Sequence, residues 1–237
     1  MKASVVLSLV LSLPACICAQ HNDTAFIAAS ESYLRQLYTT SVKGELPIYT
    51  GGAYAEYIPL NEEFPYLLSD DWISGTIVYM DDTYVDVPLQ YDLSTETIVV
   101  EHFTSARKIK LATERISEFT LADRQFVKLN TSDFPTLPES GFYEILEDGE
   151  AKLYARRKKN LQKQIVTGKL IASFEDTNRY YLLKGSVFHS VKSKTGLLKL
   201  LRDKPDLKQE VKRKKLKSLD KEARLIAISN LYNNLAQ

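Results

Sequence analysis

The sequence predicts a mainly β protein of the α+β class: a curved or partly closed antiparallel meander with an N-terminal helix and a C-terminal pair of amphipathic helices. Two observations carry this prediction. From Leu46 onward, segments rich in Tyr, Val, Ile and Thr follow one another with turn residues between them, as successive antiparallel strands do. No stretch of helical periodicity separates these segments, so a parallel sheet with crossover helices is not expected.

Residues 1–19 have the features of a secretory signal peptide. Lys2 supplies the positive charge, an apolar run covers residues 3–13, and small residues precede a cut after Ala19. Cleavage there removes both cysteines, Cys16 and Cys18, so the exported protein is expected to contain no disulfide. An alternative interpretation makes Cys16 the lipidated residue of a lipoprotein. No later apolar run is long enough for a transmembrane helix.

The N-terminal helical segment is assigned to residues 20–44, because apolar residues recur there at three- and four-residue spacings. The meander is assigned to residues 45–192. Its clearest strand covers residues 83–91, where apolar and polar residues alternate. The face expected in the core carries Val85, Val87, Leu89 and Tyr91, and the opposite face carries Tyr84, Asp86 and Gln90. Pro88 has no amide donor, so an edge or a bulge is expected beside it.

The other strands are bounded by turn residues. They are expected at 72–80, 97–103, 107–111, 116–121, 126–129, 141–146, 151–156, 180–183 and 186–191. Asp148-Gly149 and Lys184-Gly185 mark two of the hairpins. No element is assigned between residues 156 and 180.

Residues 193–237 are expected to form a basic helical pair packed on the sheet. The first helix begins near Leu197 and restarts at Pro205, and the second begins at Asp220 with Ser218 or Asp220 as its N-cap. Both carry an apolar stripe. Short amphipathic helices gain most of their stability from packing, and the meander is the surface available to them.

Charge is sorted along the chain. Residues 20–150 contain 23 acidic and 8 basic residues, whereas residues 151–237 contain 7 acidic and 22 basic residues. A chain divided in this way either pairs its own acidic and basic parts or presents a basic arm to an anionic partner.

The densest basic run is the candidate contact site for a partner or an anion. It consists of Lys208, Lys212, Arg213, Lys214, Lys215 and Lys217. Three interpretations are open: a solvated helix face, docking on the acidic meander, or binding of an external polyanion such as lipopolysaccharide or anionic lipid. Nucleic acid is disfavoured because no recognisable binding module is present and the chain is expected to be exported.

No catalytic, metal or cofactor site is assigned. The chain has three histidines, His21, His102 and His189, and no metalloprotease, nucleophile-elbow or phosphate-loop motif. Paired carboxylates are the remaining enzymatic option. The candidates are Asp70, Asp71, Asp81, Asp82 and Asp92, with Asp81, Asp82 and Asp86 also weighed for calcium. Each lies where a turn is expected, which is the ordinary use of Asp.

Tyrosines crowd the start of the meander, at Tyr49, Tyr54, Tyr57 and Tyr66. They are expected to be structural strand residues, although exposed rings could also stack on sugars. Asn22 and Asn130 are the first residues of N-glycosylation triplets in form, which matter only in a eukaryotic source.

A set of residues spread from Tyr49 to Tyr232 resembles a group of uncharacterised exported proteins of the Bacteroidota. The residues that carry the likeness are Gly75, Tyr79, Tyr84, Val87, Leu89, Tyr91, Asp92, Gly141, Phe142, Tyr143, Leu146, Gly149, Ser193, Lys194 and the run 197–201. The resemblance implies export, a sheet-rich body and a lysine-rich helical tail, and it implies no activity. Asp23-Thr24-Ala25 is similar to the O-glycosylation acceptor of such bacteria.

These observations together predict a periplasmic or cell-surface protein without catalytic activity or cofactor. It is expected to bind an envelope protein or glycan, or to act as a scaffold. A carboxylate-dependent carbohydrate hydrolase is the alternative.

Overall fold

The computed structural model describes residues 46–57, 63–102, 105–166 and 169–235, together with Ile27, Ser30, Glu31, Tyr33 and Leu34. The chain divides into two compact units, Met1–Lys43 and Gly44–Gln237. The strands and the helices α2–α4 all lie in the second unit. The predicted leader and most of the predicted N-terminal helix lie outside the described residues.

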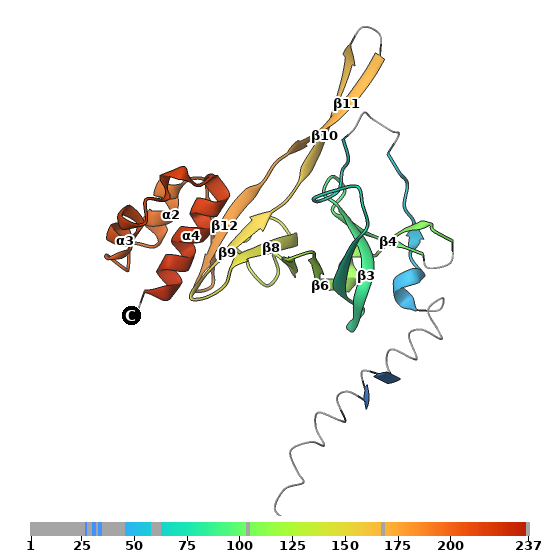
Figure 1. The fold of residues 1–237 in the computed structure, drawn as a ribbon, viewed down its shortest axis with the longest axis horizontal. Helices are drawn as coiled ribbons and strands as arrows, with labels where there is room; N and C mark the ends of the chain where they lie inside the picture. The colour runs from blue at the N-terminus through green and yellow to red at the C-terminus, as the bar shows by residue number, and fades with distance from the viewer. Residues whose placement is uncertain are drawn as a thin grey trace, which may run out of the picture. The chain divides into compact units, whose positions relative to one another are not determined.

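The second unit is mainly antiparallel β structure, followed by three α-helices (Figure 1). The strands are β1 (Gly52–Ala53), β2 (Ile73–Tyr79), β3 (Asp82–Asp92), β4 (Thr97–Glu101), β5 (Lys108–Lys110), β6 (Ile116–Leu121), β7 (Arg124–Leu129), β8 (Gly141–Glu147), β9 (Ala151–Arg156), β10 (Lys159–Val166), β11 (Lys169–Asp176), β12 (Arg179–Lys184) and β13 (Val187–Val191). The helices are α2 (Lys194–Leu200), α3 (Leu207–Arg213) and α4 (Lys221–Asn234), with 3₁₀ turns η2 (Pro47–Tyr49), η3 (Thr113–Arg115) and η4 (Leu216–Ser218).

Eleven of the strands form one sheet in the order β1-β5-β4-β3-β2-β6-β7-β8-β9-β12-β13. Most neighbours follow one another along the chain, as the predicted meander requires, and the pairing of β2 with β6 joins its two runs. β1 and β13 form the two ends of the sheet, which is therefore open. The predicted antiparallel sheet is confirmed, whereas partial closure is not found.

A bulge interrupts the predicted alternation along β3. Asp86 has a φ of +55°, and the register between β2 and β3 shifts beside it. The extra residue turns Val85 outward, where it is 65% exposed, and turns Tyr84 inward. The predicted burial of Val85 was therefore wrong. Beyond the bulge the predicted core face is confirmed for Val87, Leu89 and Tyr91.

Gln90 also departs from the alternation, because it is buried. Its side-chain amide donates to the carbonyl oxygen of Asp70 at 2.5 Å. Pro88 lies two residues after Asp86. Its missing amide costs no hydrogen bond to β4, since β3 pairs with β4 only from Leu89 onward.

Three groups of buried side chains hold the unit together. The first lies along β2–β8 and centres on Tyr91, whose ring meets those of Phe119 and Phe126 edge-on at centroid distances of 5.2 and 5.5 Å. The second lies between β9, β12 and the helices. The third lies on the opposite face, where Phe134 and Leu137 of the β7–β8 loop cover Tyr143, Tyr154, Tyr181 and Phe188.

The C-terminal helices lie on the face of β9 and β12, as predicted (Figure 1). Leu225, Ile228 and Tyr232 of α4 are fully buried there, and full burial of a Leu or Ile side chain contributes about 1.5–3 kcal/mol. Asp220 caps α4 by accepting from the Ala223 amide at 2.8 Å. The predicted pair is in fact three helices, because the first one ends at a turn before Pro205 and a new helix begins after it.

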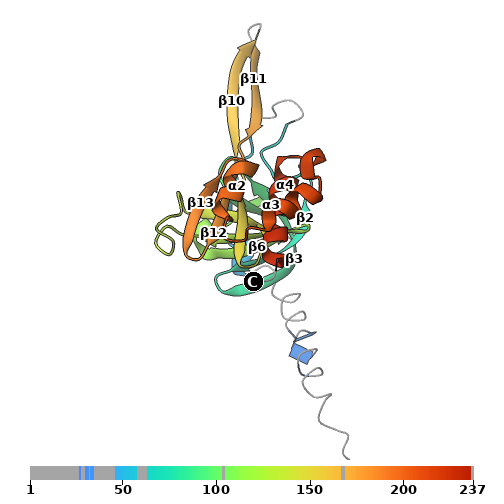
Figure 2. The same ribbon diagram turned by 90° about the vertical axis from the view of Figure 1, so that its left-hand side faces the viewer.

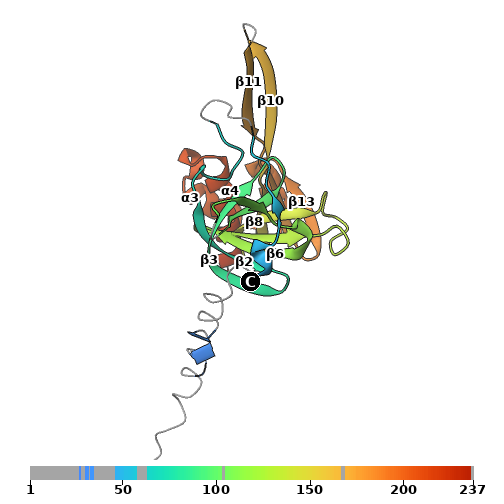
Figure 3. The ribbon, with the colours of Figure 1, turned by 90° about the vertical axis from the view of Figure 1, so that its right-hand side faces the viewer.

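β10 and β11 form a two-stranded arm that the sequence analysis did not predict. The arm continues β9 and β12 beyond the rest of the sheet: Arg156 is paired with Arg179 at the end of the sheet, and Lys159 with Asp176 at the base of the arm. Figures 2 and 3 show the arm leaving the sheet from two further sides. Its eight residues per strand extend about 26 Å.

Candidate functional site

The predicted basic run lies on α3 and the turn after it. Lys208, Lys212, Arg213, Lys214 and Lys215 are exposed. Of Lys217 only the backbone, in η4, is described. Leu207, Val211 and Leu216 of the same segment are buried among the helices and β9. Docking of the basic run on the acidic meander was therefore a wrong interpretation, because α3 turns its apolar side inward and its lysines outward.

A different set of cations joins the basic and acidic parts of the chain. Arg156, Arg157, Lys158 and Lys159, which we call the junction cluster, lie between β9 and the arm. None of these four residues is among the predicted site residues. The sequence does contain a signal for this cluster, because four consecutive cations follow one another at the end of a predicted strand. Cationic side chains are buried at such a position only when they are paired with acids.

Arg157 connects the sheet to α4. The side chains of Arg157 and Glu144 are each 5% exposed, and Arg157 Nε donates to Glu144 Oε2 at 2.5 Å. The two terminal nitrogens of Arg157 donate to the two oxygens of Glu222 at 2.5 and 2.8 Å. Tyr180 also donates to Glu222, at 2.8 Å. This bidentate geometry is the strongest form of the arginine–carboxylate pair.

Arg156 points to the opposite face and connects two loops. Its Nη2 donates to Glu96 at 2.8 Å, and its guanidinium lies over the Tyr143 ring, 4.9 Å from the centroid. Lys158 donates to Glu139 at 2.8 Å. Gly141 makes this packing possible, because a Cβ there would overlap the Arg156 guanidinium.

Lys159 anchors the base of the arm. Its ammonium donates to the carbonyl oxygens of Phe64 and Tyr66 at 2.9 and 3.0 Å, and its amide donates to the Leu93 carbonyl at 3.1 Å. Burial lowers the pKa of Lys159 below its usual value. Each cation of the junction cluster thus has at least one partner within the chain, although Nε and Nη1 of Arg156 are buried without a hydrogen bond. These contacts connect the sheet, the loops and α4.

A second ionic network connects the helices to the β8–β9 hairpin. The hydroxyl of Tyr232 lies 2.9 Å from a Glu150 oxygen and 2.7 Å from an Asp203 oxygen. Lys204 donates to Glu150 at 2.8 Å, and Lys184 donates to Asp203. The hydrogen bond from Lys204 holds the pKa of Glu150 below its usual value. Burial would raise the pKa of Asp203, but hydrogen bonds with Lys184 and Tyr232 outweigh it and hold that pKa below its usual value.

The charged pair of Glu222 leads to a prediction about pH. Burial alone would raise the pKa of Glu222, but the hydrogen bond and charge of Arg157 outweigh it, so the pKa lies below its usual 4.5. The stabilisation from ionised Glu222 is then fully present above about pH 4.5 and is lost as the pH falls through the lower folded-state pKa. We expect the difference in thermal unfolding midpoint between the wild type and Glu222→Gln to be largest near neutral pH and to shrink in acid. A difference that did not change with pH would contradict this assignment.

Asp92 is a structural residue. It is fully buried at the end of β3, where Tyr54 and Tyr57 donate to one of its oxygens at 2.8 and 3.2 Å. The amides of Ser94 and Thr95 donate to its other oxygen at 2.8 and 3.1 Å. Burial, followed by the hydrogen bonds and charge of its neighbours, raises the pKa of Tyr54. Tyr54 and Tyr57 thus bond within the chain, although neither lies in a strand as predicted.

Of the other candidate aspartates, Asp81 lies in the turn before β3, Asp82 begins β3 and Asp86 lies at its bulge. Met80 and Asp81 form the two-residue loop between β2 and β3 and have φ values of +54° and +68°, as both central residues of a type I′ turn do. Asp92 lies at the other end of β3, ten residues from Asp82, or about 33 Å along an extended strand. Asp82 and Asp92 therefore cannot act together as a catalytic pair.

An open hollow of about 590 Å³ lies beside this turn. Two acids, Asp81 and Glu114, and two cations, Arg115 and Lys128, contribute to its lining. Both acids are exposed, whereas the acid of a glycoside hydrolase lies in apolar surroundings. The hollow is thus polar and of mixed charge.

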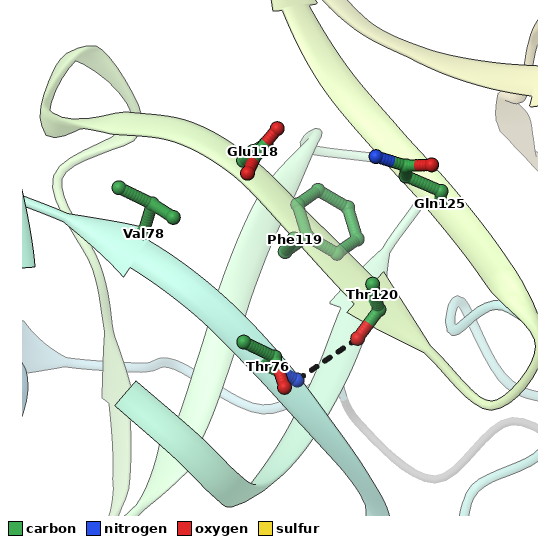
Figure 4. Close-up of a pocket in the computed structure, with 6 residues that line it drawn as sticks. All are labelled: Thr76, Val78, Glu118, Phe119, Thr120 and Gln125. Atoms are coloured by element: carbon green, nitrogen blue, oxygen red, sulfur yellow. Dashed lines mark hydrogen bonds between the residues drawn. The ribbon is translucent and has the colours of Figure 1, made fainter. Parts of the chain in front are cut away.

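A smaller pocket lies between β2 and β6 (Figure 4). Its volume is about 30 Å³, which is room for a few water molecules at most. Thr76, Val78, Glu118 and Thr120 are among its lining residues, and the Thr76 amide donates to the Thr120 hydroxyl at 3.0 Å. The pocket is a shallow depression in the surface of the sheet.

Histidines and acids do not gather into a metal site in the described part of the chain. His102 follows β4 and meets the Tyr49 ring edge-on at 6.1 Å, His189 lies in β13, and His21 is outside the described residues. Across the ranges that the structure covers, no helix is both long and apolar enough to cross a membrane.

Comparison with known proteins gives no relative. No protein-family model matches the chain, and neither a curated protein nor a solved structure matches it. The resemblance to exported Bacteroidota proteins therefore stays a prediction.

Proposed function

We propose that this is a non-catalytic binding or scaffold protein of the cell envelope, which contacts a partner protein through the β10–β11 arm. The observation that carries the proposal is the arm itself. An isolated two-stranded ribbon is marginally stable in water, and this one carries an isoleucine, Ile165, that is 77% exposed. Ile165 thus offers one apolar side chain on a projecting element, where a partner protein can cover it.

The base of the arm is held firmly. Lys159 bonds two carbonyl groups of the preceding loop, and the amide of Phe174 donates to Glu63 at 2.5 Å. The Phe174 ring meets the Tyr57 ring edge-on at 5.3 Å. A fixed base presents the distal half in one direction, which lowers the entropy cost of binding.

The edges of the arm are protected against pairing with further strands. Lys163 is exposed on β10, and an edge lysine opposes strand addition. On β11, Glu63 already occupies the outward amide of Phe174. Contact is therefore proposed through the side chains of the arm rather than through its backbone.

The carboxylate-dependent hydrolase gains less support. Three pairs of carboxylates share a partner, and both members of each pair are bonded to cations: Glu96 and Glu139, Glu144 and Glu222, and Glu150 and Asp203. Hydrogen bonds from these cations lower the pKa of Glu139 and Glu222 against the effect of burial. A carboxyl group that acts as a general acid needs a raised pKa instead.

Crosslinking tests the arm. A photocrosslinking amino acid at Lys163, which is exposed on β10 and lies on the same face of the strand as Ile165, should form an adduct with one defined envelope protein in intact cells. Ile165→Lys should abolish that adduct, because it places a charge in the proposed apolar contact. Val85→Lys is the matched control, since Val85, like Ile165, is an exposed β-branched apolar residue on a strand. An adduct that survives Ile165→Lys, or no adduct at all, would overturn the proposal.

A further inference from the structure

The outer side of α3 carries positive charge that the fold does not neutralise. Lys208, Lys212, Lys214 and Lys215, which we call the basic patch, are exposed. Arg213 beside them pairs with Glu210 at 2.6 Å. Among the described residues, no ion pair within 4.0 Å involves a lysine of the basic patch.

Other cations of the basic half do pair with the acidic half. Arg156 and Arg157 reach Glu96 and Glu144, and Lys204 reaches Glu150. Residues 207–217, in contrast, contain six basic residues and one acidic residue. The lysines of the basic patch therefore form no short ion pair with the acidic part of the chain, and like charges this close together repel one another.

One lysine of the basic patch is also unfavourable for the backbone. Lys215 follows the C-cap of α3 and has the left-handed conformation, with φ +48° and ψ +44°. Glycine or asparagine is the usual residue at this position, and a side chain there costs about 1 kcal/mol. A residue that breaks a local rule without a gain in folding is expected to serve function.

The chemistry of the basic patch favours a membrane surface over other anions. Lysine clusters on an amphipathic helix attract anionic headgroups. No aromatic residue lies in the segment 207–218, so it lacks the rings on which single-stranded nucleic acid stacks. The apolar side of α3 is already buried, so the helix can lie against headgroups but cannot insert. The predicted leader, residues 1–19, would also bring the chain to a membrane.

We propose that the basic patch is an electrostatic docking surface for a membrane leaflet rich in anionic phospholipid. Binding is peripheral and reversible, and it uses charge alone. The proposal rests on observations separate from those for the arm, so either can fail without the other.

Vesicle flotation of the full chain tests this surface. Vesicles of phosphatidylcholine with about one third phosphatidylglycerol should bind the protein at low salt, and pure phosphatidylcholine should not. Raising the ionic strength should release it, because screening acts within about 8 Å at physiological salt. Changing the four lysines of the basic patch to Gln should weaken binding by at least about fiftyfold, since each lysine near such a surface contributes about 1 kcal/mol.

The matched control removes the same charge elsewhere. Its substitutions are Arg107→Gln, Lys110→Gln, Lys163→Gln and Lys192→Gln, all at exposed positions outside the helices. This variant should keep most of the binding. Equal losses in the two variants would mean that only net charge matters and would overturn the assignment of a site. Binding of a soluble anionic polysaccharide without binding of vesicles would overturn it as well.

A single substitution separates folding from docking. Lys215→Gly should raise the thermal unfolding midpoint, because glycine accepts the left-handed conformation, and should weaken vesicle binding by about fivefold. Unchanged vesicle binding by this more stable variant would contradict the proposal even if the fourfold variant failed to fold.

Discussion

Arg157→Ala is expected to lower the free energy of unfolding by about 3–5 kcal/mol, because removal of one partner from a buried ion pair leaves an uncompensated charge. Glu144 is 4% exposed, and its remaining cation, Arg124, lies 3.3 Å away. Glu222 would lose both of its hydrogen bonds from Arg157, and α4 would lose its bidentate connection to the sheet. Urea unfolding followed by circular dichroism measures the effect.

Arg213→Ala is the matched control. Arg213 pairs with Glu210 within α3 and is 73% exposed in its side chain, so its removal should cost no more than about 1 kcal/mol. Combining Arg157→Met with Glu144→Leu should recover part of the loss, since the unpaired charge is then removed as well. Equal costs for Arg157→Ala and Arg213→Ala would show that the pair with Glu144 is not buried in solution.

Leu89→Ala is expected to cost about 2–5 kcal/mol, because Leu89 is 1% exposed in the main core. Val85→Ala lies on the same strand, four residues earlier, and should cost less than about 0.5 kcal/mol, since it is an exposed site without such contacts. The two variants therefore distinguish the bulge from a regular strand. In a regular alternation both side chains share the buried face, and comparable large losses would refute the bulge at Asp86.

Local patterns identified most of the meander. β6 has the same bounds as predicted, residues 116–121, because the turn residues on both sides and the pattern within the segment indicate the same limits. The hairpins at Asp148-Gly149 and Lys184-Gly185 are also where their turn residues indicate. The burial of the helical tail could be predicted because a stripe of apolar residues at helical spacing requires a partner surface.

The arm and the bulge were not predictable in the same way. Along β10 and β11 the polar and apolar residues do not alternate regularly, since no extensive core covers this ribbon and no burial pattern is imposed on it. At Asp86 one extra residue reverses which side chains of β3 point into the core. The residue types at Val85 and Asp86 give no sign of this reversal.

The sequence by itself determined the antiparallel strands, the apolar faces of the helices and the division of charge into an acidic and a basic part. Only the tertiary structure decided which charges meet. Arg156 and Glu96 are separated by 60 residues and Arg157 and Glu222 by 65. The first pair forms because the β3–β4 turn lies beside the end of β9, and the second because α4 packs on β9. Such buried pairs form only when the whole chain has folded, since an unpaired charge at either site is strongly destabilising. The lysines of α3 stay in solvent, because the apolar side of that helix is the side that packs.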